Sequence, residues 1–170
     1  MEEALLQHAA EVEDDDAEPT ALAVTSFVAF YEDCFASMVR LAYLLTGSEW
    51  LAEDLVHDAF ARVYVRWRRV REPRAYLRRA VINACRSAQR QLVRERRLKS
   101  RELVTHASLD ADELFDALAA LPYRQRAALV LKFYEGRSHA EIAALLGCRE
   151  GTVSSLVHRG VEQLRRVIER

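Results

Sequence analysis

The stretch SHAEIAALLGCREGTVSSLVHR, residues 138–159, has the steric pattern of two short helices that cross at a tight turn. Ala143 is small, as a close crossing of two helices requires. Gly147 stands where the turn needs a positive φ, and Val153 returns to the core from the second helix. Together with the polar residues that follow, this spacing predicts a helix-turn-helix.

The second helix of this motif is polar on its outward side. Arginine reads guanine edges in the major groove of DNA, and hydroxyl groups contact phosphates or base edges. We therefore predict that this face binds DNA, with an ordinary helical hairpin as the alternative interpretation. The predicted contact residues are Arg149, Thr152, Ser154, Ser155, His158 and Arg159.

Basic residues are concentrated upstream of this motif. The net charge of the whole chain is −1, yet residues 62–101 contain fifteen Lys or Arg and only two acids, Glu72 and Glu95. Fourteen of the fifteen are arginine, whose planar fork pairs with phosphate or guanine. A solvated, salt-bridged helix is the alternative, but it would need acids interleaved with the bases. The block therefore predicts contact with a polyanion.

The remaining sequence predicts an all-α protein with two small helical domains. Only 5 Gly and 3 Pro occur in 170 residues, too few for the turns of a many-stranded sheet. Apolar residues recur every three or four positions in 27–45 and 52–67, and Pro73 suits the start of a third helix. We predict an acidic disordered tail at 1–24, a domain at 25–98, a flexible linker at 99–111 and a second domain at 112–170.

Several other classes of protein are disfavoured. No stretch approaches the length of a membrane span, and the acidic N-terminus does not resemble a secretory signal. Three widely spaced cysteines indicate neither a disulfide framework nor a zinc site, so we expect a cytoplasmic protein without cofactor or metal. Glu53, Asp54, His57 and Asp58 offer metal-capable groups, but they oppose the apolar stripe of their helix, which disfavours a di-iron enzyme.

Three stretches together resemble the extracytoplasmic-function sigma factors of bacteria, especially their actinobacterial branch. They are RLAYLLTGSEWLAEDLVHDAFARVYVRW (40–67), PRAYLRRAVINACRSAQRQ (73–91) and ALAALPYRQRAALVLKFYEGRSHAEIAALLGCREGTVSSLVHRGVEQLRR (117–166). The resemblance implies an RNA polymerase initiation factor in two domains. The first would bind the clamp helices of core polymerase and open the −10 promoter element. The second would bind the −35 element and the polymerase flap.

The resemblance also assigns residues by position. It implies that Asp54, His57 and Asp58 face core polymerase, with His57 where the family commonly has Gln. It implies that the loop RWRRVREPRAYL (66–77) captures an unstacked −10 base. Ser154 and Leu156 depart from the Lys and Arg common in the second domain, which suggests fewer phosphate contacts there. The implied −10 contacts are Trp67, Arg74, Arg78, Asn83 and Arg86, although the place of Trp67 on an apolar stripe favours a core role.

A stand-alone helix-turn-helix repressor or activator is the alternative function. Such proteins usually dimerise to match two half-sites, and the sequence offers no dimerisation heptad or ligand-sized extra domain. The basic block also lies outside the predicted reader helix. Catalysis would belong to the polymerase, so we do not predict an enzyme. Anti-sigma regulation is common in the family, and the apolar faces beside the linker would serve such a partner.

Overall fold

The computed structural model describes residues 21–98 and 113–168. The predicted linker at 99–111 and most of the predicted acidic tail lie outside these ranges. The first described helix begins at Ala21, four residues before the predicted domain boundary at 25. Every element within the described ranges is helical, which confirms the all-α prediction.

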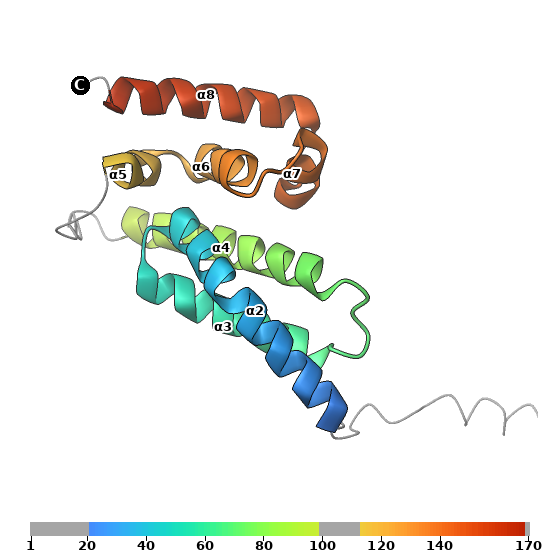
Figure 1. The fold of residues 1–170 in the computed structure, drawn as a ribbon. Coiled ribbons are helices and arrows are strands. Elements are labelled where there is room, and N and C mark those ends of the chain that lie inside the picture. Colours follow the sequence, from blue (N-terminus) through green and yellow to red (C-terminus); the bar gives the residue numbers. More distant parts are fainter. Residues whose placement is uncertain (1–20, 99–112, 169–170) are drawn as a thin grey trace, which may run out of the picture.

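The helices form two tiers (Figure 1). In the view of Figure 1 the C-terminal half, residues 113–168, lies above the N-terminal half, residues 21–98. The N-terminal half contains α2 (Ala21–Thr46), α3 (Glu49–Val65) and α4 (Pro73–Leu98). The C-terminal half contains α5 (Glu113–Ala120), α6 (Tyr123–Leu129), the π-helix η1 (Val130–Tyr134), α7 (His139–Leu146) and α8 (Glu150–Ile168).

The N-terminal half folds because three helices share one apolar core. Gly47 at φ 79° lets the chain reverse after α2. Ser48 then caps α3, its side chain accepting a hydrogen bond from the Leu51 amide at 3.4 Å. The side chains that fill this core are fully or almost fully buried. They include Leu41, Leu45, Val56, Val63, Leu77 and Val81.

The helix-turn-helix forms as predicted, from α7 and α8. The Ser138 hydroxyl accepts from the Glu141 amide at 3.2 Å, and the Glu141 carboxylate accepts from the Ser138 amide at 2.8 Å. This reciprocal capping box satisfies amides that the first turn of α7 leaves unpaired. Gly147 adopts the left-handed conformation at φ 61°, and Val153 is fully buried. These local signals therefore position the polar face of α8.

The segment from Tyr123 to Tyr134 is not α-helical along its full length. After Leu129 the chain widens into the π-helix η1, and the Glu135 amide donates to the Val130 carbonyl oxygen at 3.1 Å. Gly136 at φ 65° then ends the segment. A π-turn changes the direction in which the following side chains point, and such turns are frequent at functional positions. Here the Glu135 side chain, just after the π-helix, points toward Arg78 of the N-terminal half.

The two halves pack directly against each other, which the sequence did not predict. Their buried apolar side chains form one continuous cluster. The Tyr43 ring of α2 stacks on the Phe115 ring of α5, with centroids 4.4 Å apart. The Tyr123 hydroxyl of α6 donates to the Ile82 carbonyl oxygen of α4 at 3.1 Å. Both contacts join residues far apart in the sequence, where helical periodicity carries no information.

Candidate nucleic-acid interface

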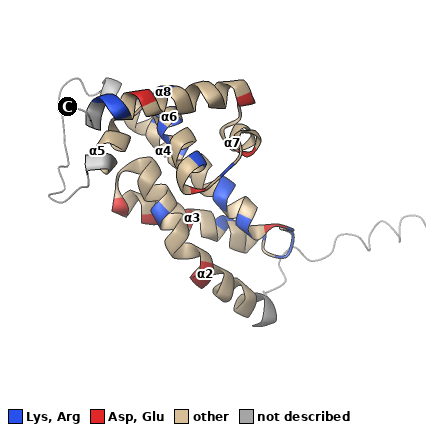
Figure 2. Cartoon of the chain, turned by 45° about the horizontal axis from the view of Figure 1, so that its top comes forward, with Lys and Arg blue, Asp and Glu red and all other residues tan. Residues whose placement is uncertain are grey.

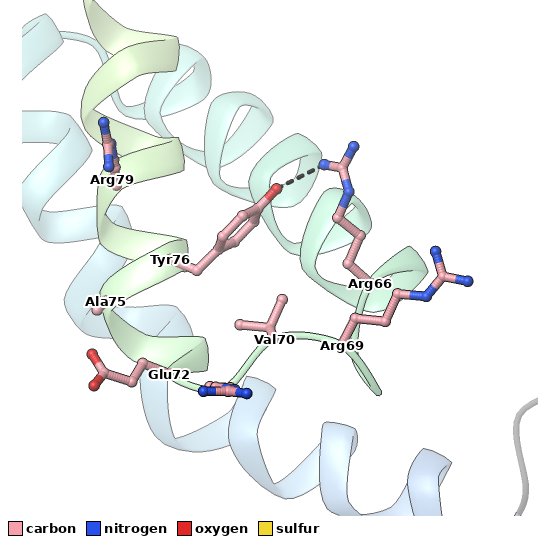
Figure 3. Close-up of a pocket in the computed structure, with 8 residues that line it drawn as sticks. Arg66, Arg69, Val70, Glu72, Ala75, Tyr76 and Arg79 are labelled. Atoms are coloured by element: carbon pink, nitrogen blue, oxygen red, sulfur yellow. Dashed lines mark hydrogen bonds between the residues drawn. The ribbon is translucent and has the colours of Figure 1, made fainter.

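A basic pocket of about 460 Å³ lies where α3 leads into α4 (Figure 3). The Arg66 guanidinium, just after α3, donates to the Tyr76 hydroxyl of α4 at 2.7 Å. Figure 3 shows the Tyr76 ring spanning the space between the two helices, with Val70 beside it. The lining residues are Arg66, Arg69, Val70, Arg71, Glu72, Ala75, Tyr76 and Arg79.

This pocket combines the two features that bind single-stranded nucleic acid. The arginines provide positive charge for phosphates, and the half-buried Tyr76 ring offers a face for base stacking. The family resemblance implied a base-capturing loop at 66–77 but did not single out Tyr76. An aromatic residue within a run of arginines is the signal that would have indicated it.

The four polar residues predicted along α4 have different surroundings. Asn83 is exposed, and Arg74 is exposed but paired with Asp33 of α2. Arg78 is half-buried, with its Nε 2.6 Å from Oε2 of Glu135 in the other half. Arg86 is also half-buried, and its charge acts on the nearby Tyr123. Part of the predicted DNA-binding face of α4 is therefore covered by the C-terminal half.

Trp67 lies in an aromatic cluster at one end of the N-terminal half. Its ring centroid is 5.0 Å from that of Phe30 and 5.3 Å from that of Phe27. Its indole N–H donates to the Ser26 hydroxyl at 3.0 Å. This half-buried position agrees with the core role favoured by its apolar stripe, and its contact with DNA stays a prediction.

All six residues predicted on the reader face of α8 are exposed. Arg149, just before α8, and Thr152, His158 and Arg159 within it are among them. The Ser154 hydroxyl lies 3.2 Å from Nδ1 of His139 in α7, and the Ser155 hydroxyl donates to the Gly151 carbonyl oxygen at 3.1 Å. The face is thus open to a groove of DNA, with Ser154 oriented by the first helix of the motif.

The acidic face of α3 is also exposed, at Asp54, His57 and Asp58. His57 lies with its Nε2 3.2 Å from the Tyr31 hydroxyl and its ring centroid 4.9 Å from that of Phe35. Within residues 21–98 and 113–168 there is no group of three or more His, Cys, Asp or Glu placed to share a metal ion. Figure 2 shows acidic segments on α2 and α3 and basic ones in the loop before α4.

Buried polar groups lie between the halves. Burial raises the pKa of the Cys85 thiol to about 12 and raises that of Tyr123 well above its ordinary value. Arg126 is 3% exposed, and burial lowers the pKa of its guanidinium. The Arg126 guanidinium donates to the Ala119 carbonyl oxygen at 3.2 Å. This contact between halves therefore includes charge and thiol groups as well as apolar side chains.

Comparison with known proteins identifies both halves. The profile of Sigma-70 region 2 matches residues 30–95, and that of Sigma-70, region 4 matches residues 111–164. The RNA polymerase sigma-E factor of Streptomyces coelicolor is 35% identical over 138 residues, covering 76% of this chain and 78% of that protein. The ECF RNA polymerase sigma factor SigL of Mycobacterium tuberculosis is 34% identical over 155 residues, covering 83% and 88%.

Solved structures share the fold. The sigma factor RpoE of Bartonella quintana, solved with the anti-sigma factor NepR, matches with a TM-score of 0.69 and 24% identity, over 85% of this chain and 97% of that one. CnrH, solved with the cytosolic domain of CnrY, matches with a TM-score of 0.60 and 21% identity, over 92% and 98%. None of the helices in the described ranges combines the length and apolar composition needed to cross a membrane. With both region profiles in order along the chain and relatives matched over most of their length, this chain belongs to the sigma-70 family and is an extracytoplasmic-function RNA polymerase sigma factor.

Proposed function

We propose that the basic pocket before α4 holds an unstacked base of the −10 element while α8 reads the −35 element. The observation that carries the proposal is Tyr76, whose ring faces a pocket lined by arginines. A flipped base needs a stacking surface, and the adjacent melted strand needs phosphate neutralisation. Arg74, Arg78, Asn83 and Arg86 would continue the strand contacts along α4.

Tyr76 variants test this assignment in transcription with reconstituted core polymerase. Tyr76→Phe keeps the ring and removes the hydroxyl that accepts from Arg66. We expect Tyr76→Ala to lose about tenfold in open-complex formation, because one stacked base is worth roughly 1–3 kcal/mol. Tyr76→Phe should retain most of it. Equal promoter melting by the Ala variant and the unchanged protein would refute the pocket as the base-binding site.

The reader face of α8 is tested at Arg159. A side chain in contact with a base edge contributes about 1–3 kcal/mol of discrimination, so Arg159→Ala should weaken promoter use and relax the preference at one −35 position. Selection from a randomised −35 library compares the two proteins directly. An unchanged preference would remove Arg159 from the reader set.

The acidic face of α3 is proposed to bind the clamp helices of core polymerase, and region 4 to bind the flap. Asp54 is exposed, so Asp54→Lys should fold normally. We expect this charge reversal to weaken core binding, because like charges across an interface repel. Retained core affinity, measured by fluorescence anisotropy of labelled protein, would refute this assignment.

An anti-sigma factor is the further partner that we propose. Two proteins of the same fold were solved with such partners or with a cytosolic domain. This chain also exposes Phe133 at 68% on an apolar groove that includes Leu118 and Leu164. A two-hybrid screen of genomic fragments, repeated with Phe133→Asp, tests it: a partner that binds only the unchanged chain and silences its transcription supports the proposal.

Catalysis is assigned to the polymerase, and this chain is proposed to supply recognition and strand opening without chemistry of its own. Adding core polymerase tests this division of roles, since a stand-alone repressor would bind duplex promoter DNA without it. Transcription from a promoter library only when this chain joins core polymerase is the expected result.

A further inference from the structure

Two large apolar side chains of α3 lie almost entirely in solvent. Val65 is 82% exposed and Trp50 is 76% exposed, the highest values for large apolar residues in the part of the chain that the structure describes. Tryptophan is highly buried on average in folded proteins. The opposite side of α3 already supplies the core with Val56 and Val63, which are fully buried. Packing within this chain therefore does not account for Trp50 or Val65.

Both side chains lie on the same face of α3 as the acidic residues. At about 100° per residue, Asp54 lies about 40° around the helix axis from Trp50, and Val65 lies about 60° around it. His57 and Asp58 fall about 20° to one side and about 80° to the other, so the five share less than a third of the circumference. All five are exposed. We call these residues, Trp50, Asp54, His57, Asp58 and Val65, the outer stripe of α3.

The outer stripe has its apolar groups at the ends and its charges in the middle. Trp50 lies in the first turn of α3, and Val65 is its last residue. At a rise of about 1.5 Å per residue, the two lie about 22 Å apart along the axis. A partner that covers the whole stripe must therefore be elongated, as a helix or a pair of helices is.

The acids alone would give such a complex little affinity. Exposed ion pairs are weak and are screened by salt, and charges across an interface mainly raise the association rate and select the partner. Most of the binding energy of an interface comes from a few residues, among which tryptophan is enriched. One aromatic side chain buries about 150–250 Å² when a partner covers it. The ends of the stripe are therefore the places where affinity can arise.

We propose that Trp50 and Val65 are apolar anchors that hold core RNA polymerase on α3, on either side of the acids that orient it. The proposal rests on the function proposed above for this face of α3. It also defines the chemistry of the polymerase surface: basic groups in the middle, a wide apolar recess for the indole at one end and a smaller one for valine at the other. Trp50 is the more important anchor because its ring offers the larger area.

Truncation of each anchor tests the proposal through the affinity for core polymerase, measured by fluorescence anisotropy of labelled full-length protein. Trp50→Ala should weaken binding by at least about tenfold, the effect of losing an interface hot spot. Trp50→Phe should lose less, because it keeps a ring. Val65→Ala should lose about twofold to fivefold, because it removes less apolar area. Val28→Ala makes the same change at an exposed valine of α2 and should bind like the unchanged protein.

Salt separates the anchors from the acids. The loss caused by Asp54→Lys should shrink as salt is raised above about 0.1 M, because screening then acts within about 10 Å. The loss caused by Trp50→Ala should persist, because the burial of apolar area does not depend on charge. Thermal unfolding of each variant should match that of the unchanged protein, since Trp50 and Val65 are exposed.

Burial of the indole can be observed directly. The chain has two tryptophans, and Trp67→Phe keeps an aromatic ring in the cluster with Phe27 and Phe30. Position 50 then carries the single indole of the chain, which can be incorporated as 5-hydroxytryptophan and excited separately from the tryptophans of core polymerase. Acrylamide should quench its emission strongly in the free protein and at least about threefold less in the complex, because a covered ring excludes the quencher.

Either of two results would overturn the proposal: Trp50→Ala binding core polymerase as tightly as Val28→Ala, or equal quenching of the position-50 indole in the free and bound protein. A Trp50→Ala variant that loses self-association in sedimentation but keeps its affinity for core would assign the indole to a second copy and also overturn it. Retained core affinity in Asp54→Lys would instead refute the proposed function of α3. Loss of affinity in Asp54→Lys but not in Trp50→Ala would refute the anchors alone.

Discussion

Tyr43 of α2 and Phe115 of α5 stack nearly face to face across the junction of the two halves, with ring planes 9° apart and centroids 4.4 Å apart. Neither half alone would place these rings together. Mutating either ring therefore tests the contact between the two halves and not the folding of one half by itself. The stacked rings share no residue with the Arg78–Glu135 ion pair, so each contact can be removed by mutation without changing the residues of the other.

Phe115→Ala should lower the free energy of unfolding by about 2 kcal/mol. The ring is half-buried, and truncation removes apolar contact area together with the aromatic pair. Phe115→Leu keeps much of the area and loses only the stack, so its loss should be smaller. Urea unfolding followed by circular dichroism measures both. Equal stability of all three proteins would mean that the junction does not contribute to folding.

Gly160→Ala should destabilise the protein by up to about 2 kcal/mol. A Cβ at this position would lie 2.8 Å from Cδ1 and 3.0 Å from Cγ of Leu129, which is buried where α6 meets α8. The cost of overpacking, about 1–3 kcal/mol, exceeds the roughly 1 kcal/mol that alanine gains in helix propensity.

Gly151→Ala provides the matched control on the same helix. Nothing lies within 4 Å of the added Cβ there, so only the propensity gain remains. Thermal unfolding should show opposite signs for the two variants. A Gly160→Ala protein as stable as Gly151→Ala would contradict the close approach of α6 and α8.

The capping box of α7 should make stability depend on pH in acid. The Ser138 amide, with Arg137 and the Ser138 hydroxyl, lowers the pKa of Glu141 from 4.5 to about 2. A carboxyl group with a lowered folded pKa contributes stability above its unfolded value, and the contribution disappears as pH falls toward 2. The melting temperatures of the unchanged protein and Glu141→Gln should differ above pH 5 and converge toward pH 2. A constant difference would contradict this role.

The three cysteines should react with thiol reagents at very different rates. Cys148 is half-buried, whereas Cys34 and Cys85 are buried and burial raises both of their pKa values, that of Cys85 to about 12. Thiolate is the reactive form, so at pH 8 a disulfide reagent should modify Cys148 first. Cys148→Ser should remove the fast phase, and denaturation should expose the other two. A fast phase that persists in Cys148→Ser would refute this order.

Local features of the fold could be predicted from the sequence because nearby residues determine them. The capping serine and glutamate, the left-handed Gly147 and the apolar stripes all act within one or two turns of helix. The same applies to the exposed faces of α3 and α8. Short-range patterns such as these survive in almost any tertiary arrangement.

Long-range features escaped the sequence analysis. Arg78 and Glu135 are too far apart in the chain for periodicity to pair them, and an arginine in a basic run gives no sign of an internal partner. Tyr76 lines its pocket only because the loop before α4 folds back toward Arg66. In both cases the geometry depends on how helices are placed, and the pattern within each helix does not specify that placement.

The wide turn of η1 carries a consequence for insertions and deletions in this family. A π-turn accommodates one more residue than the surrounding α-helix would need, so it amounts to a single-residue insertion. Deleting one residue there would restore the ordinary pitch and rotate everything that follows by about 100° about the helix axis. The Glu135 carboxylate would then point away from α4. Relatives that lack the extra residue would therefore have no internal counter-ion for the arginine at position 78.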